Sequence, residues 1–311
     1  DLLKDFVPSH LALYQIDGKQ MALPHYTGVS GLFYNTNMFD EAGVPHPDET
    51  WTWETITEAA RKLTKRTGET VTQWGYDVHP DWDRLVQWVW ENGGRVIDEG
   101  TFVGNRLYFD EEPAIAAFEH LHSLIWEAGV AAPYSVIGRW PHDMFWGGQE
   151  LAVWHTGSWD ISATLERCTC DFNVAPRPMG PGGIRSAVHT SDGYMVYRGT
   201  NAPDAAVKFL LFLVSPEAQR LQMDRANLQP ARLSLGVAYA TETEGARKGL
   251  NMKIFIDQTA YARPAPLFVN QQAVMELRWP YVDRMLYRNE LPVRQGMIEW
   301  ARTANALMAG Q

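Results

Sequence analysis

The chain has 311 residues, 45% of them hydrophobic, which is enough to form two cores of ordinary size. Acidic residues outnumber basic ones by 37 to 27, and the formal net charge at pH 7 is −10. A chain this acidic is repelled by anionic lipid and by a nucleic-acid backbone, so we expect no nucleic-acid partner. The longest apolar stretch, 207–214, contains Lys208 and is too short to span a bilayer. We interpret it as a buried helix face.

The first half of the chain alternates predicted strands and helices. Residues 17–19 form a turn and 30–35 a strand, and Asn37 is predicted to cap a short helix that ends at Gly43. Thr52 is predicted to cap a second helix, which continues to about residue 64. The other elements predicted here are a strand at 72–78, a helix from Pro80 to the pair Gly93-Gly94, and a helix over 111–130.

The second half repeats this alternation. We predict strands at 150–155, 171–175 and 193–197, and helices at 158–167, 203–214 and 216–224. The last fifty residues form two or three further helices. Strands that alternate with helices predict an α/β architecture with mainly parallel sheets.

The only two cysteines, Cys168 and Cys170, are separated by one residue. Two thiols cannot complete a four-ligand zinc site, and the nearby histidines do not have zinc-finger spacing. A bridge between positions i and i+2 is sterically awkward, although an oxidising compartment allows it. We therefore expect ordinary structural thiols, no metal site and no cofactor.

Five stretches of the chain, taken in order, carry a family resemblance. They are 17–24 (Asp-Gly-Lys-Gln-Met-Ala-Leu-Pro) with 31–35 and Phe39 to Gly43; 50–54 (Thr-Trp-Thr-Trp-Glu); the Trp-bearing helix closed by Gly93-Gly94; 145–153 with Gly157-Ser158-Trp159; and 205–210 with 215–219. Their order and spacing resemble the family-1 extracellular solute-binding proteins, the group that includes maltose-binding protein.

The resemblance implies the type II periplasmic-binding-protein fold, in which two α/β lobes are joined by a multi-segment hinge. In this family about 100 residues, a small domain's worth, precede the Asp-Gly-Lys segment, so we expect lobe one to be incomplete. The implied division assigns residues 1–27 and 191–263 to lobe one and the hinge, and 28–190 and 264–311 to lobe two. The chain would cross between the lobes near 24–28, 191–193 and 263–266.

The same resemblance implies a function. The protein would be the substrate-binding component of an ABC importer that binds a mono- or oligosaccharide in the cleft and delivers it to the membrane permease. We expect no enzymatic activity, a monomer, and export to the periplasm or the cell surface, as a lipoprotein whose leader has been removed.

The candidate ligand-binding residues are those that supply aromatic faces and polar groups to sugar hydroxyls. Trp159 follows Gly157-Ser158 at a strand-to-helix turn, where the matching family position often stacks on a sugar ring; the alternative is packing in the core. Asp81, Trp82 and Asp83 lie at a loop-to-helix junction, although the two carboxylates could simply favour the helix dipole. The remaining candidates flank the two crossings: Tyr26, Thr27 and Ser30 at the first, and Ser191, Asp192, Gly193 and Tyr194 at the second.

Several other residues are weaker candidates. Trp140 or Trp146 could line the cleft, and the amides of Asn270, Gln271 and Gln272 stand at a helix start. Trp51 and Trp53 are assigned to packing, and His155 to a structural role.

Two other functions stay open. A glycoside hydrolase needs two carboxyls that flank a sugar from opposite sides, and Asp81 and Asp83 are too close in sequence for that. A glycerol-phosphate binder needs an anion site, for which Arg139, Arg185 and Arg263 are available.

Overall fold

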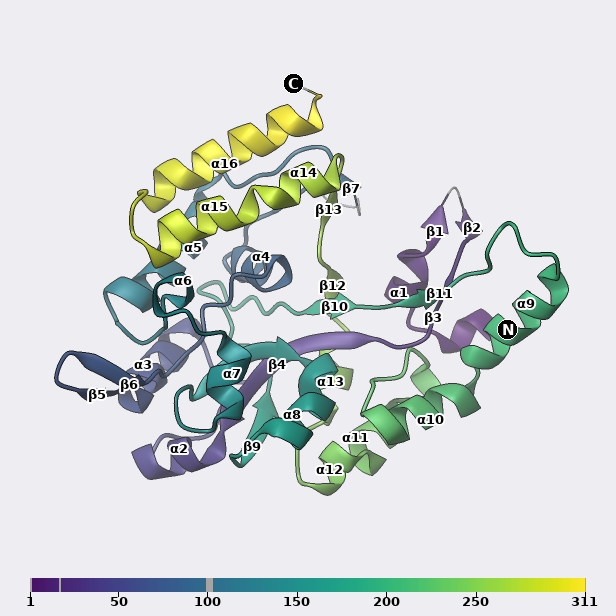
Figure 1. The fold of residues 1–311 in the computed structure, drawn as a ribbon, viewed down its shortest axis with the longest axis horizontal. Coiled ribbons are helices and arrows are strands. Elements are labelled where there is room, and N and C mark those ends of the chain that lie inside the picture. The colour runs from purple at the N-terminus through teal and green to yellow at the C-terminus, as the bar shows by residue number, and fades with distance from the viewer. Residues whose placement is uncertain (1, 17, 99–102, 311) are drawn as a thin grey trace.

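The computed structural model describes residues 2–16, 18–98 and 103–310. Asp17, which begins the predicted turn and the first family motif, lies outside the described residues. The chain forms a larger body on one side and a smaller body on the other, joined by extended segments that run between them (Figure 1).

The larger body is built around β4 (Gly28–Asn35), a strand whose eight residues are all buried. It pairs antiparallel with β8 (Val153–Gly157), β9 (Phe172–Ala175) and β10 (Val188–Thr190), while β12 (Arg263–Pro264) runs parallel to β10. The prediction of mainly parallel sheets is therefore wrong for this sheet. The strands that flank β4 arrive from the opposite direction, so their hydrogen bonds form antiparallel ladders.

Helices cover this sheet and bury one continuous core. The main ones are α3 (Trp53–Leu63), α4 (Trp82–Glu91), α5 (Glu112–Trp126) and α16 (Val293–Met308). The other elements of this body are α2 (Thr36–Ala42), β5 (Lys65–Thr67), β6 (Thr70–Gln73), β7 (Val103–Gly104), α6 (Tyr134–Ile137), α7 (Pro141–Trp146), η2 (Ser158–Asp160), α8 (Ile161–Arg167), β13 (Leu267–Phe268), α14 (Gln271–Glu276), α15 (Arg278–Val282) and η4 (Asp283–Tyr287).

Local signals fix several of these boundaries. Thr52 caps α3 as predicted, since its hydroxyl accepts from the Thr55 amide at 3.3 Å in a reciprocal capping box. The cap of α2 is Asn35 rather than Asn37, because the Asn35 side chain accepts from the Met38 amide at 3.1 Å. The predicted strand at 72–78 forms only in part: residues 72 and 73 end β6, which pairs with β5, and Trp74 and Tyr76 make isolated bridges to Leu151 and Ala131.

The smaller body contains η1 (Leu2–Asp5), α1 (Pro8–Ala12), α9 (Pro203–Leu213), α10 (Pro216–Ala226) and η3 (Leu233–Leu235). Its strands form two separate pairs, β1 (Gln15–Ile16) with β2 (Lys19–Gln20) and β3 (Leu23–Pro24) with β11 (Gly193–Tyr194). Its hydrophobic cluster has five buried members: Phe6, Leu11, Leu23, Val214 and Ala231. This body therefore lacks a layered α/β core within the described residues.

Residues 236–262 pack with the larger body. They form α11 (Gly236–Glu242), α12 (Glu244–Arg247) and α13 (Lys253–Gln258), and their side chains Tyr239, Met252 and Phe255 belong to the larger core. This packing differs from the expectation that 191–263 accompany lobe one. The connection that precedes them meets the first crossing where the Thr27 amide donates to the Gln229 carbonyl at 2.8 Å.

The two cysteines differ from the expectation of free thiols. Cys168 and Cys170 form a disulfide, with their Cα atoms 5.3 Å apart. The turn after α8 brings the two sulfurs together, so the short spacing does not prevent the bridge. Among the described helices, none has the length and apolar character needed to cross a membrane.

Candidate functional site

Arg84 is the centre of a charged cluster at the start of α4. Its Nη1 donates to both carboxylate oxygens of Asp83 at 2.8 and 2.7 Å, and it lies 3.5 Å from Asp81. Nη2 lies 3.4 Å from the Thr156 hydroxyl on β8. Burial alone would lower the pKa of Arg84, but the negative charges of Asp83 and Asp81 raise it above its usual range. The cluster holds a fixed cation against the end of the central sheet.

Trp159 lies beside this cluster. Its ring packs on the backbone of β4, where a Cβ on Gly28 would lie 2.7 Å from Cε3, so this position requires glycine. The guanidinium carbon of Arg84 lies 5.2 Å from the ring centroid, a cation–π distance. The indole is only partly buried. The structure thus brings together Trp159, Asp81 and Asp83, three of the predicted residues, from two separate elements.

A pocket of about 500 Å³ adjoins this cluster. It is lined by His79, Asp81, Arg84, Trp140, His142, Trp146, Trp154, Asp160 and Arg167. Burial raises the pKa of Asp160, which accepts a hydrogen bond from Thr156. Trp140 is 48% exposed, and its ring centroid lies 6.3 Å from that of Trp279. The pocket therefore combines indole surface with hydrogen-bonding groups, a combination that suits a polyhydroxylated ligand.

Sequence reasoning missed Arg84, Asp160, Arg278 and His79. Arg278, at the start of α15, lies 3.4 Å from Asp81 although 197 residues separate them. Arg84 could have been found, because it follows Asp81 at helical spacing i+3, where opposite charges meet. Nothing in the local sequence places Arg278 at the site.

Trp82 does not join the site. It is 7% exposed, and its indole nitrogen donates to the Pro266 carbonyl at 3.0 Å. Its ring packs with Phe109, Phe268 and Trp300 in the larger core. A side chain enclosed in this way presents no stacking face to a ligand, so the structure corrects the expectation for this residue.

The candidates at the first crossing are mostly internal. Thr27 is buried and hydrogen-bonded to the His10 ring, and the Ser30 hydroxyl donates to Gln87 Oε1 at 2.7 Å. Tyr26 is half-buried, and desolvation raises the pKa of its hydroxyl. Thr27 and Ser30 therefore use their polar groups within the protein, which leaves Tyr26 as the accessible member of this group.

The candidates at the second crossing line the joint between the two bodies. The Ser191 hydroxyl donates to the Tyr26 carbonyl at 2.9 Å, and the Ser191 carbonyl accepts from the Tyr14 hydroxyl at 2.6 Å. A Cβ on Gly193 would lie 2.7 Å from the Tyr14 ring, so glycine serves a close side-chain approach here. Tyr194 stacks on His25 with centroids 4.5 Å apart, and Asp192 is exposed.

His155 is an internal residue, and the weaker candidates line two separate pockets. His155 is fully buried, and burial next to Arg177 holds the pKa of its ring well below its usual range. Trp140 and Trp146 both line the pocket beside Arg84. Asn270, Gln271 and Gln272 line a separate hollow of about 450 Å³ at the start of α14.

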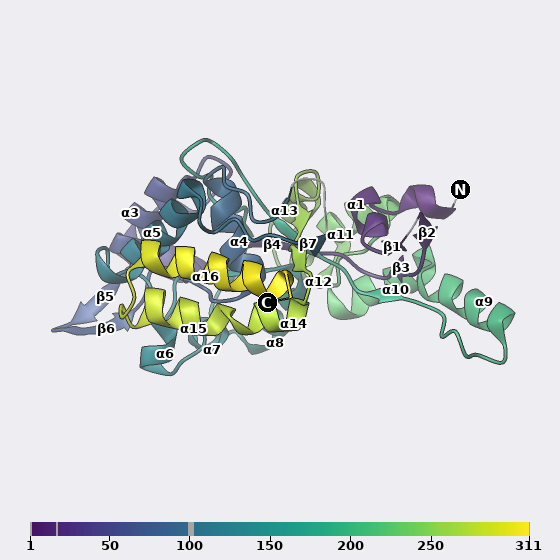
Figure 2. The same cartoon turned by 90° about the horizontal axis from the view of Figure 1, so that it is seen from above.

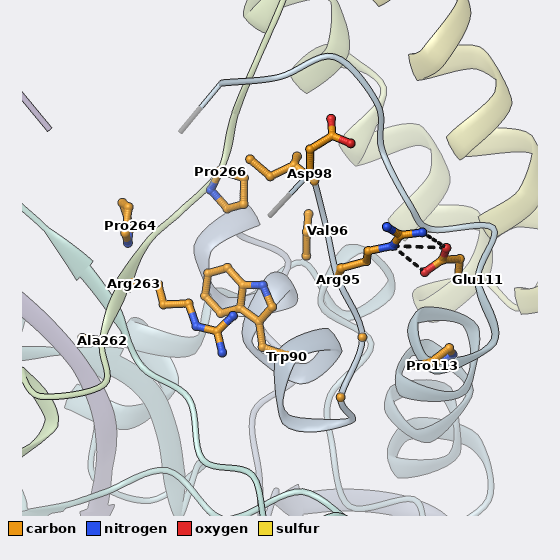
Figure 3. Close-up of a pocket in the computed structure, with 13 residues that line it drawn as sticks. Trp90, Arg95, Val96, Asp98, Glu111, Pro113, Ala262, Arg263, Pro264 and Pro266 are labelled. Carbon is orange, nitrogen blue, oxygen red and sulfur yellow. Dashed lines mark hydrogen bonds and ion pairs between the residues drawn. The ribbon is translucent and has the colours of Figure 1, made fainter. Parts of the chain in front are cut away.

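A larger pocket of about 760 Å³ lies at the opposite end of α4 (Figure 3). The Arg263 guanidinium lies 5.2 Å from the Trp90 ring centroid, and across the pocket Arg95 pairs with Glu111 at 2.6 Å. None of the eleven predicted ligand residues lines this pocket. We therefore place the candidate site at the Arg84 end of α4, next to the crossings.

The fold and this site define a class of two-lobed solute-binding protein. The chain matches the family model of bacterial extracellular solute-binding proteins over residues 2–220, and it belongs to that family.

Solved structures share the type II fold of sugar-binding proteins. An ABC substrate-binding protein from Listeria monocytogenes in complex with cycloalternan aligns with a TM-score of 0.85 and 20% identity, covering 99% of this chain and 76% of that one. A cyclic α-maltosyl-1,6-maltose binding protein from Arthrobacter globiformis aligns with a TM-score of 0.81 and 21% identity, covering 100% and 78%.

A curated relative is similar in sequence as well. It is the arabinooligosaccharide-binding protein of Halalkalibacterium halodurans, 27% identical over 221 residues, which cover 68% of this chain and 47% of the relative. The chain thus spans about half the length of this relative.

Proposed function

We propose that the protein is the carbohydrate-binding component of an ABC importer, which captures a mono- or oligosaccharide between its lobes and delivers it to the membrane permease. The observation that carries the proposal is the Arg84 cluster beside Trp159, next to the crossings between the two bodies. Membership in an extracellular solute-binding family supports export, and the names of the relatives support a sugar ligand.

The site residues we propose are Trp159, Asp81 and Asp83 from the sequence prediction, together with Arg84, Asp160 and Trp140. Tyr26 and the Ser191 to Tyr194 segment would line the hinge side of the cleft. For the lobes, we propose that lobe one and hinge end near residue 235, because α11 to α13 pack on the larger core.

Charge pairing argues against a phosphate ligand held by Arg84 or Arg278. The guanidinium groups of Arg84 and Arg278, which face Asp81, already have carboxylate partners at 2.7 and 3.4 Å. A phosphate would have to displace these carboxylates or be repelled by them. The same pairing argues against a glycosidase that would use Asp81 and Asp83, because both carboxylates contact Nη1 of Arg84 instead of opposing each other.

Thermal-shift screening tests this proposal. The panel would contain arabino-oligosaccharides, maltose, cyclic glucose oligosaccharides and glycerol phosphate, with each Tm followed against ligand concentration. A sugar that binds the folded state raises Tm by mass action, by an amount that grows with concentration. A response to glycerol phosphate alone, or to nothing on the panel, would contradict the carbohydrate assignment.

A further inference from the structure

The disulfide between Cys168 and Cys170 lies behind one wall of the pocket beside Arg84. It closes the turn that follows α8, and its two sulfur atoms lie 3.5 and 3.9 Å from the Phe145 carbonyl oxygen of α7. Helices α7 and α8 lie beside each other at the surface of the larger body (Figure 2). α8 therefore connects Asp160, which lines the pocket, to the bridged turn at its other end.

The bridged turn is hydrogen-bonded to the end of α7 that carries Trp146. The Thr169 amide donates to the Trp146 carbonyl at 3.0 Å, and the Thr169 hydroxyl donates to the Gly147 carbonyl at 3.1 Å. The next residue, Gly148, has a φ of 73°, and a Cβ there would lie 2.7 Å from the Thr169 hydroxyl oxygen. This position therefore requires glycine, because the turn and the end of α7 are in direct contact.

Two side chains extend this contact into the pocket. Arg167, directly before the bridge, places its guanidinium carbon 5.0 Å from the centroid of the Trp146 ring. The Trp146 indole nitrogen donates to the Thr164 hydroxyl at 3.1 Å, and the ring meets Trp154 edge-on with centroids 5.8 Å apart. Trp146, Trp154 and Arg167 all line the pocket. The shape of this wall therefore depends on the conformation of the bridged turn.

The hydrogen bonds of the turn are not enough to keep it in one conformation. Thr169 is exposed, and a hydrogen bond that water can replace contributes little net stability. The bridge removes this freedom, but it closes a loop of so few residues that its entropic contribution to global stability is small for a disulfide. The larger body already has a continuous core. A bridge of this kind fixes local geometry more than it stabilises the fold.

We infer that the Cys168–Cys170 disulfide is a positioning element of the sugar site, which holds the Trp146 indole and the Arg167 guanidinium in their places on the pocket wall. The cysteines act through these two side chains and do not contact the ligand. The inference rests on the proposed function for the kind of ligand, and on the geometry alone for the position of the indole. Reduction by a dithiol, which adds two electrons and two protons to give two thiols, would release the turn. The site would then have its full affinity only in an oxidising compartment.

Fluorine NMR of protein labelled with fluorotryptophan tests the positioning without any ligand. Because the chain has only these two cysteines, dithiothreitol reduces a single bond and is itself oxidised to its cyclic disulfide. We expect the Trp146 resonance, assigned with Trp146→Phe, to move on reduction, while the resonance of the buried Trp300 stays in place. A Trp146 resonance that does not move, or a Trp300 resonance that moves with it, would contradict the inference.

Isothermal titration with arabinotriose and maltotriose measures the effect on binding. Cys168→Ser combined with Cys170→Ser should weaken binding about three- to tenfold, because the indole must then be ordered when the sugar binds. In a Trp146→Ala background the same serine pair should change the affinity by less than about twofold, since the side chain that it positions is absent. Equal losses in the two backgrounds would give the bridge a general structural role and overturn the inference.

The serine pair is also the matched control for the reductant. Dithiothreitol should weaken sugar binding by the unsubstituted protein and have no effect on the serine pair, and circular dichroism should show the same fold in all samples. Equal weakening in both proteins would mean that the reductant acts elsewhere, and the inference would fail. If neither sugar binds the unreduced protein, it is the proposed function that fails for these ligands, and the fluorine resonances still decide whether the bridge positions Trp146.

Discussion

The two bodies of this molecule bury their apolar side chains to very different extents. All thirteen tryptophans lie between residues 51 and 159 or between 279 and 300, so the smaller body contains none. The larger body encloses Trp88, Trp300 and Arg177 completely, whereas no residue of α9 in the smaller body is more than partly buried. The expectation of a buried helix face at 207–214 is therefore wrong, except at Val214. Burial of apolar area is the main stabilising contribution to folding. We therefore expect the larger body to be stable without the smaller body, and the smaller body to be the less stable part of the chain.

The largest expected effect is on the buried ion pair of the larger body. Arg177 and Glu91 are both fully buried, with Nε and Oε1 2.7 Å apart. Arg177→Met leaves the Glu91 carboxylate buried without its partner, so we expect a loss of about 3–5 kcal/mol in the free energy of unfolding. Urea denaturation followed by tryptophan fluorescence measures this loss, and the signal reports the larger body alone.

The control for this variant is an exposed pair of the same type. Arg294 lies 2.6 Å from Glu112, with both side chains at least half exposed, so Arg294→Met should cost at most about 1 kcal/mol. Equal losses in the two variants would show that the interior of the larger body is far more accessible to water than the structure indicates.

The second effect is a dependence on pH that has opposite signs at two buried sites, the His10–His189 pair and Asp77. The ring centroids of His10 in the smaller body and His189 on the central sheet lie 4.1 Å apart with the rings tilted by 39°, and burial lowers their pKa values from 6.5 to about 3 and about 4. The unfolded chain therefore binds protons that the folded chain does not, so this joint loses stability as the pH falls from about 6.5 to 4. Because one pKa unit corresponds to about 1.4 kcal/mol, the loss amounts to a few kcal/mol.

Asp77 in the larger body behaves in the opposite way. Burial raises the pKa of its carboxyl from 3.8 to about 7, so the folded chain holds a proton that the unfolded chain lacks between these two values. Its contribution to stability grows as the pH falls from 7 to 4. Hydrogen exchange at pH 7 and pH 5 should show faster opening at the His10 joint in acid. His10→Phe should reduce that response, and Asp77→Asn should remove the stabilising contribution that Asp77 makes in acid. A joint that is equally protected at both pH values would contradict the assignment of neutral histidines.

The third effect is on ligand binding. If Trp159 stacks on a sugar, Trp159→Ala should weaken binding by about 1–3 kcal/mol, by analogy with the stacking of bases on aromatic side chains. Trp126→Ala is the matched control, because Trp126 is 43% exposed on α5 and lies outside the pocket beside Arg84. Isothermal titration with the sugar found by screening measures both. Unchanged affinity in the Trp159 variant would leave this indole a purely structural role.

The sequence predicts what depends on neighbours along the chain. The Thr52 cap and α5 depend on residues within one or two helical turns, so the local sequence was sufficient to predict them. Trp82 and Trp159 stand in similar contexts, each with an Asp beside it at the start of a helix, yet one is enclosed and the other is partly open. The difference comes from Pro266 and Trp300, which are far away in the chain. The partnership of Asp81 with Arg278 and the exposure of α9 likewise depend on which segments meet in space.

The smallest expected effect comes from removing the N-terminal cap of one helix in each body. Thr52 caps α3 of the larger body, and the Ser215 hydroxyl caps α10 of the smaller body by accepting from the Ala218 amide at 3.2 Å. Either residue replaced by Ala should cost about 1 kcal/mol locally. Because α3 belongs to the continuous core, Thr52→Ala should lower the Tm of the whole larger body. Ser215→Ala should leave that Tm unchanged and speed amide exchange only in α9 and α10, since they open without the larger core. Equal shifts of Tm in the two variants would mean that both bodies unfold as one unit, and that the five-member cluster of the smaller body is strong enough to couple them.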